Sequence, residues 1–441
     1  MKLKMYGDGR KGIAINTLGV AATGLSSIVI GNITYCMTTS YAMAGTVVGL
    51  VLLLSRIFDG ITDIIAGFLI DRCHFKLGKA RPFDLFNIPM WIFLVLCFEV
   101  PALNTVGKAV YLFVMYNLCQ SICFTFVTVS GTVRLKRTFV EEVRAKVLAA
   151  CSMVTALIST IAGIVTPILI SIFENRPHGW TIIASIFAVP AIFMTLFQFF
   201  MLPEMKDPDE EEKKEARKVE LKESVGAFFQ NPYLFLIVIV IVSNMLCLTI
   251  SGTVSTYYFK YNMGELTIAS LIGVFSLVGY IFLAGMPALT KQFGNRKTAM
   301  IAYVMVFVGN IAKLLMPRSV AWLIVCTIVG QVGITLAVSV RDMILIDSMQ
   351  YGKLKTGVEG EGIYAAVRGF SEKIANGMGP FLIGVILDFA HFNGSAEVQP
   401  QSATTAILIL FAVLPAVIGA VAFVAMYFCR MEDKIKEMEQ S

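Results

Sequence analysis

Stretches of about 20 or more apolar residues recur along the whole chain, separated by short polar segments. A helix needs roughly 20 such residues to cross the hydrocarbon core of a bilayer. Each stretch is therefore predicted to be a membrane-spanning helix. Twelve are found, near residues 13–37, 42–70, 83–103, 108–133, 147–173, 180–202, 233–258, 267–288, 298–316, 319–345, 363–388 and 404–429.

The composition agrees with an all-α integral membrane protein. The chain is 57% hydrophobic and 15% charged, with a mean hydropathy of +0.76, whereas soluble domains have about 25% charged residues. The first stretch is too long for a secretory signal peptide and lacks a convincing cleavage site. The net charge of +6 follows from basic loops, so nucleic-acid binding is not predicted.

The basic residues predict the orientation, because Lys and Arg accumulate in cytoplasmic loops. Most of the 36 lie in the amino terminus, the even-numbered loops, the middle loop and the carboxyl tail. Four lie in the opposite loops and four within spans: Lys108, Arg176, Lys260 and Arg318, then Arg56, Lys313, Arg368 and Lys373. We therefore expect both termini in the cytoplasm and a multi-pass protein of the cell membrane.

The chain divides into two similar halves. We expect a six-helix bundle at 1–202, a charged cytoplasmic loop at 203–230, a second six-helix bundle at 231–429 and a tail at 430–441. A short basic loop with a central glycine follows the second span of each half, at Gly78 and at Gly294. This repeat is typical of the major facilitator fold, in which pseudo-symmetric bundles rock around a midplane site. We expect the protein to function as a monomer.

The second span contains three charges, Arg56, Asp59 and Asp63. At about 100° per residue they fall within roughly 60° of one helix face. A charge at that depth costs about 2.5–3.5 kcal/mol, so such residues usually have a function. The two carboxylates, at i and i+4, can converge on a sodium ion or exchange a proton. The alternative is a static salt bridge between the halves.

Three further spans contain polar residues that suggest binding. The fourth has a stripe of hydroxyls at Thr125, Thr128 and Thr132, which either bind a solute or bond to their own backbone. The seventh contains Asn244 and ends near Tyr257, an aromatic residue suited to a ligand ring or to the membrane interface.

The eleventh span contains Arg368, Glu372 and Lys373. Arg368 and Glu372 are predicted to pair within the helix. Lys373 then needs another partner, and the aspartates of the second span are candidates. The alternative is that Lys373 extends to the cytoplasmic interface.

With these residues, the chain resembles the glycoside–pentoside–hexuronide:cation symporters, the family of the melibiose permease. The similarity is strongest in RIFDGITDIIAGFLIDRCHFKLGKARPF, which starts at Arg56, and it resumes at Asn244, Tyr257–Gly264, Asp347–Gly352 and Lys373. The resemblance implies that Asp59, Asp63 and Thr125 bind the cation, with Lys373 close to them. It also implies cytoplasmic gating positions at Lys79, Arg81, Arg144 and Glu361.

The chain departs from the melibiose permease at its sugar-binding positions. Thr23, Thr128 and Met153 stand where that pattern has two aspartates and an arginine, and Thr132 stands where it has a tryptophan. The cation site therefore resembles the family pattern, whereas the galactoside site does not. Thr23, Thr128, Thr132, Tyr257 and Asn244 are the expected substrate-cavity residues.

The predicted function is sodium- or proton-coupled symport of a sugar, namely a glycoside, pentoside or uronide, by alternating access. No cofactor, no metal beyond the transported cation and no enzymatic activity are expected, and the predicted partners are the solute and membrane lipids. Transport of a lysolipid or other amphiphile on the same fold is one alternative. A non-transporting membrane sensor is another, although the soluble segments are short for a signalling domain.

Overall fold

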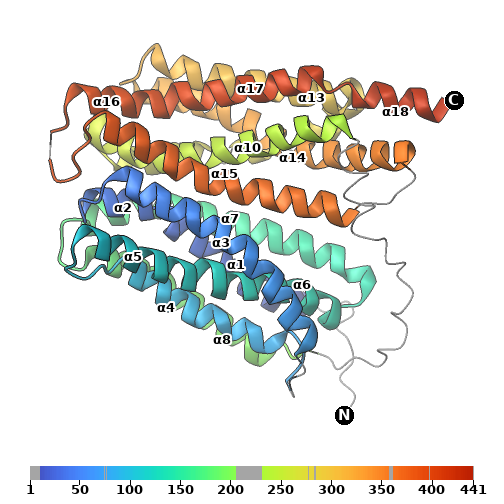
Figure 1. Ribbon diagram of the computed structural model, residues 1–441, viewed down its shortest axis with the longest axis horizontal. Coiled ribbons are helices and arrows are strands. Elements are labelled where there is room, and N and C mark those ends of the chain that lie inside the picture. The colour runs from blue at the N-terminus through green and yellow to red at the C-terminus, as the bar shows by residue number, and fades with distance from the viewer. Residues whose placement is uncertain are drawn as a thin grey trace. The chain divides into compact units, whose positions relative to one another are not determined.

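The computed structural model describes residues 10–73, 75, 77–204, 231–276, 278–282, 285–356, 361–396 and 398–440. Apart from one isolated β-bridge between Phe75 and Gly78, every regular element in these ranges is a helix (Figure 1). The all-α prediction is therefore confirmed. The predicted middle loop lies outside the described residues from position 205 to 230.

Eight continuous helical stretches in the described part are long and apolar enough to cross a membrane. Helix α3 is not among them, and it contains the three charges of the second predicted span. The eight stretches are Arg10–Thr39, Thr105–Thr138, Glu141–Phe173, Gly179–Met201, Pro232–Asn262, Met286–Leu314, Val320–Lys355 and Gln401–Ile435.

The helices form two compact units. The N-terminal unit comprises Met1–Glu215 and the short segment Asn393–Glu397, and the C-terminal unit comprises Ala216–Phe392 and Val398–Ser441. Because each unit buries its own apolar surface, each has its own core.

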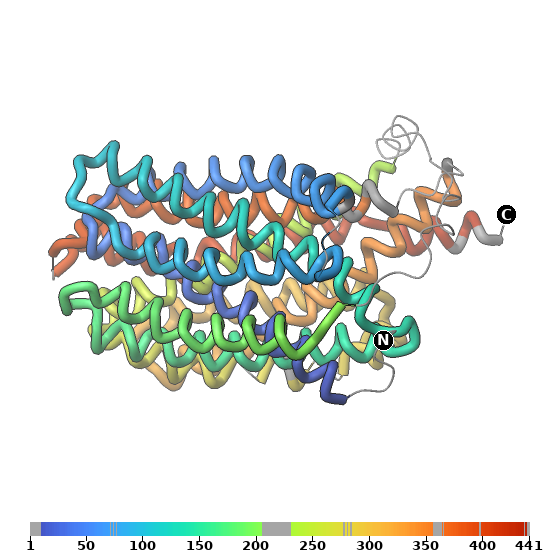
Figure 2. Tube along the Cα trace, turned by 90° about the horizontal axis from the view of Figure 1, so that it is seen from below, coloured from blue at the N-terminus to red at the C-terminus, as the bar shows by residue number. Residues whose placement is uncertain are grey.

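The N-terminal unit is built around α1, which packs against α7 and α8 (Figure 2). Helix α3 packs against α5, η2 and α6, and this contact positions the charged face of α3. The elements are α1 (Arg10–Ile30), α2 (Ile33–Thr39), α3 (Gly45–Arg72), η1 (Arg81–Phe86), α4 (Asn87–Cys97), α5 (Thr105–Tyr116), η2 (Asn117–Phe124), α6 (Thr125–Thr138), α7 (Glu141–Phe173) and α8 (Gly179–Met201).

In the C-terminal unit α13 packs against α14 and α17, and α10 packs against α15 and α17. Val240, Tyr303, Val340 and Ala422 from these helices meet in the core. The elements are α10 (Pro232–Tyr257), η4 (Tyr258–Asn262), α11 (Thr267–Ser276), α12 (Val278–Phe282), α13 (Met286–Ile311), η6 (Ala312–Leu314), α14 (Val320–Thr356), α15 (Glu361–Phe389), α16 (Gln401–Leu408), η7 (Ile409–Val413), α17 (Leu414–Phe428) and α18 (Met431–Gln440).

Three of the long helical stretches contain a π-helical segment: η2, η4 and η7. Such wide turns are rare and occur frequently at functional sites. The segment η2 ends directly before Thr125, so it helps set the position of that side chain. The apolar pattern of the sequence gives no sign of these segments.

A glutamate after the last long helix fixes the glycine loop of the N-terminal unit. Gly78 has a φ of +119°, and a Cβ at this position would lie 2.5 Å from Glu204 Oε2. The Glu204 carboxylate also lies 2.7 Å from Arg137 Nε. It accepts three hydrogen bonds of 2.7–3.0 Å, from the backbone amides of Lys79, Ala80 and Arg81. We call Glu204 with these three amides the N-terminal clamp.

The C-terminal unit has an equivalent contact. Gly294 has a φ of +80°, and a Cβ there would lie 2.8 Å from Glu432 Oε2. The other oxygen of Glu432 accepts a 2.8 Å hydrogen bond from the backbone amide of Arg296. The Arg296 side chain donates to the carbonyls of Met426 and Tyr427. We call Glu432 with the Arg296 amide the C-terminal clamp.

Candidate functional site

The charged residues of α3 share one face, as the helical spacing predicts. Asp59 is 5% exposed, and Arg56 Nη1 lies 3.5 Å from Asp59 Oδ2. Ile61 and Ile64, from other faces of the helix, are 54% and 76% exposed, which is suitable for contact with lipid. The helix thus has a partly buried charged face and an exposed apolar one.

The side chain of Thr125, the first residue of α6, lies between the two aspartates. Its Oγ1 is 3.2 Å from Asp59 Oδ1 and 3.1 Å from Asp63 Oδ1. A hydroxyl has one proton, so it donates to only one carboxylate at a time. A bound proton or cation would reduce the repulsion between the two carboxylates. This arrangement of three hard oxygens suits a small cation.

A second polar contact fixes the register of these helices and was missed by the sequence analysis. Asn117 Nδ2 donates to Ser55 Oγ at 2.9 Å, and Ser121 Oγ donates to Asn117 Oδ1 at 2.9 Å. Ser55, Asp59 and Asp63 recur every four residues on α3, and Asn117, Ser121 and Thr125 do so across η2 into α6. This matched spacing is the signal that could have identified them.

Tyr116 is another site residue that the sequence analysis missed. Arg56 Nη2 donates a 2.7 Å hydrogen bond to its hydroxyl, and the guanidinium lies 5.6 Å from the ring centroid. Arg56 is therefore held between Tyr116 and Asp59. The positive charge can balance the aspartates without saturating their oxygens.

The predicted pair in α15 is confirmed, because Arg368 Nε lies 3.1 Å from Glu372 Oε1. Arg341 and Asp342 of α14 complete this ion-pair cluster. Arg341 Nη2 is 3.1 Å from Glu372 Oε1, and Asp342 Oδ2 is 3.2 Å from Arg368 Nη2. Lys373 follows Glu372 on α15 of the C-terminal unit, and its coupling to the aspartates stays a prediction.

The predicted substrate-cavity threonines all bond to their own helices. Thr23 of α1 is buried and donates to the Gly19 carbonyl at 3.4 Å. Thr128 and Thr132 of α6 are exposed within their unit, and each donates at 2.9 Å to a carbonyl of the preceding turn. The hydroxyl oxygen of each threonine can still accept a hydrogen bond through its lone pairs.

The two predicted substrate residues of α10 are fully buried in the C-terminal unit. Asn244 Oδ1 accepts a 3.0 Å hydrogen bond from the hydroxyl of Tyr303. Tyr257 packs edge to face on Phe392, with ring centroids 5.6 Å apart. Binding of a solute to either residue stays a prediction.

The predicted gating residues have structural contacts in the N-terminal unit. Lys79 and Arg81 contribute amides to the N-terminal clamp, and Arg81 Nη2 donates to the Phe199 carbonyl at 2.6 Å. Arg144 donates to the carbonyls of Phe139 and Lys136. Glu361 begins α15, and its side chain lies outside what the structure describes.

Comparison with known proteins identifies relatives over nearly the whole chain. The family described as MFS/sugar transport protein matches residues 15–433. The isoprimeverose transporter of Lactiplantibacillus pentosus is 28% identical over 417 residues, which cover 91% of this chain and 85% of that protein. The glucuronide carrier protein homolog of Escherichia coli (strain K12) is 26% identical over 407 residues, covering 88% and 84%.

Solved structures share the fold at low sequence identity. A bacterial homolog of the human lysosomal transporter Spinster superposes with a TM-score of 0.71 at 14% identity. The superposition covers 97% of this chain and 99% of that one.

Proposed function

The chain belongs to the MFS/sugar transport protein family, and on that premise we propose that it brings a sugar or glycoside into the cell together with a cation. Its relatives include a transporter of isoprimeverose and a homolog of a glucuronide carrier. These names favour a glycoside, pentoside or uronide over other solutes.

The family and the span-length helices make the chain a multi-pass protein of the cell membrane and a transporter rather than an enzyme. We propose twelve spans, six in each unit, with both termini in the cytoplasm. The two compact units support this proposal, because alternating access needs two bundles that move as bodies.

The observation that supports cation coupling most strongly is the position of Thr125 between Asp59 and Asp63. The Thr125 hydroxyl has one carboxylate oxygen of each aspartate within 3.2 Å, so an added sodium ion or proton would relieve the repulsion between the two carboxylates. We propose that these three residues bind the coupling cation.

Cation binding would drive uptake through the charge of the site. Asp59 and Asp63 carry two negative charges, and carboxylates are costly to enclose in a bilayer. A bound cation offsets this negative charge and lowers the cost of closing the transporter around its solute. Coupling follows because the loaded form changes its access more readily than the half-loaded form.

The remaining predicted residues have supporting roles in this proposal. Lys373 would couple the cation site to conformation by competing for the aspartates. Thr23, Thr128, Thr132, Tyr257 and Asn244 would contact the solute, and Lys79, Arg81, Arg144 and Glu361 would act at the cytoplasmic gate.

Uptake into membrane vesicles tests the proposal. Labelled isoprimeverose and a labelled glucuronide would be offered with a sodium gradient, with a proton gradient and with neither. We expect one gradient to drive accumulation, and Asp59→Asn and Asp63→Asn to abolish it. Asp433→Asn, which changes an exposed carboxylate on α18, is the matched control.

Two outcomes would contradict this function. Gradient-driven uptake that survives Asp59→Asn would exclude the proposed cation site. Uptake of a labelled lysolipid, with no uptake of any sugar, would favour the amphiphile transporter instead.

A further inference from the structure

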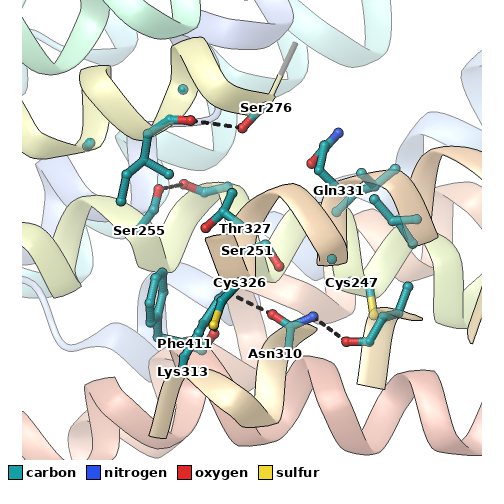
Figure 3. A pocket seen from close by; sticks show the side chains of 18 of the residues that line it. Cys247, Ser251, Ser255, Ser276, Asn310, Lys313, Cys326, Thr327, Gln331 and Phe411 are labelled. Carbon is teal, nitrogen blue, oxygen red and sulfur yellow. Dashed lines mark hydrogen bonds between the residues drawn. The ribbon is translucent and has the colours of Figure 1, made fainter. Parts of the chain in front are cut away.

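The C-terminal unit contains a pocket of about 320 Å³, which is within the usual range for small-molecule sites. It lies among α10, α11, α13 and α14, and Phe259 of η4 also lines it. Phe411 of η7 forms an aromatic wall (Figure 3). Its polar lining residues are Ser251, Ser255, Ser276, Asn310, Lys313, Thr327 and Gln331.

Among the described residues that line this pocket, Lys313 alone is charged, and it is 6% exposed. Its Nζ donates to Asn310 Oδ1 at 2.8 Å and to the Phe411 carbonyl at 3.5 Å. The ammonium also lies 4.2 Å from the centroid of the Phe411 ring (Figure 3). Among the residues that the structure describes, no carboxylate lies within 4.0 Å of it.

This environment solvates the lysine without neutralising it. An amide oxygen, a carbonyl and a ring face are all neutral, whereas buried charges in proteins are usually paired with an opposite charge. The ion pairs of the nearby α14 and α15 use Arg341 and Arg368, not Lys313. An anionic group entering the pocket would therefore supply the missing counter-charge.

Other lining groups are available to a hydroxylated ligand. The hydroxyls of Ser251 and Thr327 make no hydrogen bond to another residue in the described ranges, although both line the pocket. Gln331 Nε2 makes only a long contact of 3.4 Å, to Thr335. The aromatic walls add surfaces on which a sugar ring can pack.

We propose that this pocket binds a sugar acid, with Lys313 as the contact for its carboxylate. This proposal rests on the proposed sugar transport. It adds a site in the C-terminal unit that selects anionic sugars. Ser251, Thr327 and Gln331 contact the hydroxyls of the ligand. The pocket discriminates sugar acids from neutral sugars because only the acid neutralises Lys313.

Isothermal titration of the purified full-length protein tests this assignment. The probes are D-glucuronate, D-glucose and acetate, each titrated into wild type, Lys313→Met and Lys313→Arg. We expect wild type to prefer D-glucuronate, and Lys313→Met to weaken that affinity by about 10- to 100-fold, as for loss of a charged hydrogen bond. Lys313→Arg should retain the preference for the acid.

Lys108→Met is the matched control, because Lys108 belongs to the N-terminal unit and its Nζ also donates to a carbonyl, that of Tyr41. It should bind all three probes as wild type does. Should Lys313→Met fail to fold, Lys313→Arg and Thr327→Val decide the question. The arginine variant should keep the preference for the acid, and Thr327→Val should weaken D-glucuronate and D-glucose alike.

Three results would overturn the proposal. Equal loss of D-glucuronate and D-glucose in Lys313→Met would make the lysine structural. Acetate binding as tightly as D-glucuronate would make this a site for free anions. Loss of the acid preference in Lys313→Arg with unchanged folding would also contradict it. Because isoprimeverose uptake is measured separately, failure here with intact uptake refutes only the pocket, whereas absent sugar uptake refutes the proposed function.

Discussion

Replacing Thr125 by valine removes one oxygen from the proposed cation site while nearly preserving the side-chain volume. In the structure this hydroxyl lies 3.2 Å from Asp59 and 3.1 Å from Asp63. A hydrogen bond to a charged group contributes about 1.5–3 kcal/mol. Since about 1.4 kcal/mol corresponds to a factor of ten, the half-saturating cation concentration should rise about 10- to 100-fold.

The assay is solute uptake by membrane vesicles as a function of sodium concentration at fixed pH, and as a function of pH without sodium. Thr125→Ser keeps the hydroxyl and should remain within a few-fold of wild type. Thr166→Val is the matched control, because Thr166 is also buried but donates to the Ala162 carbonyl of its own helix. The reasoning is refuted if Thr125→Val shifts the cation dependence no more than Thr166→Val.

Three further changes test the N-terminal clamp and the Arg56 contact. Gly78→Ala should lower the unfolding free energy by about 1–3 kcal/mol, because φ is +119° and the new Cβ meets Glu204. Gly163→Ala is the control, because a Cβ at Gly163 meets no atom within 4 Å. Equal melting temperatures for the two variants would contradict the predicted loss at Gly78. Glu204→Gln should cost about 3–5 kcal/mol by breaking a buried ion pair, so an unchanged melting curve would argue against the clamp. Tyr116→Phe frees Arg56 to compete at Asp59, and should raise the half-saturating cation concentration about 2- to 10-fold; vesicle uptake with unaltered cation dependence would exclude this role.

The charged face of α3 could be predicted because helical periodicity alone determines which residues share a face. The spacing of Arg56, Asp59 and Asp63 was enough to predict that they share a face. Predicting which residues of other elements contact them requires the packing of the helices as well. Tyr116 and Asn117 contact α3 because of the register between two helices, and η2 adds a wide turn there. Neither register nor a π-helical turn is encoded in apolar periodicity.

The same distinction applies to the C-terminal unit. The Arg368–Glu372 pair lies within one helix turn and was predicted, whereas Arg341 joins it from α14 by packing. Lys313 was noted as a charge within a span. Its surroundings depend on Asn310 of α13 and Phe411 of η7, which lies about 100 residues further along the chain.

The sequence showed that the two halves have equivalent glycine loops, at Gly78 and Gly294. It did not show that Glu204 and Glu432 contact these loops. Glu204 lies more than 120 residues after Gly78 in the chain, and Glu432 lies a similar distance after Gly294. A carboxylate that accepts backbone amides leaves no signature at the amide positions, because every residue type except proline has the same donor.

Each clamp has a consequence for the order in which the chain is made. Glu204 follows all of the helices that the structure describes between residues 10 and 201, and Glu432 follows those described between residues 232 and 428. During synthesis the glycine loop therefore emerges well before the carboxylate that fixes it. The N-terminal clamp can form only after the six predicted spans that precede it have left the ribosome. The residues of this clamp are therefore all available before the helices of the C-terminal unit have been translated.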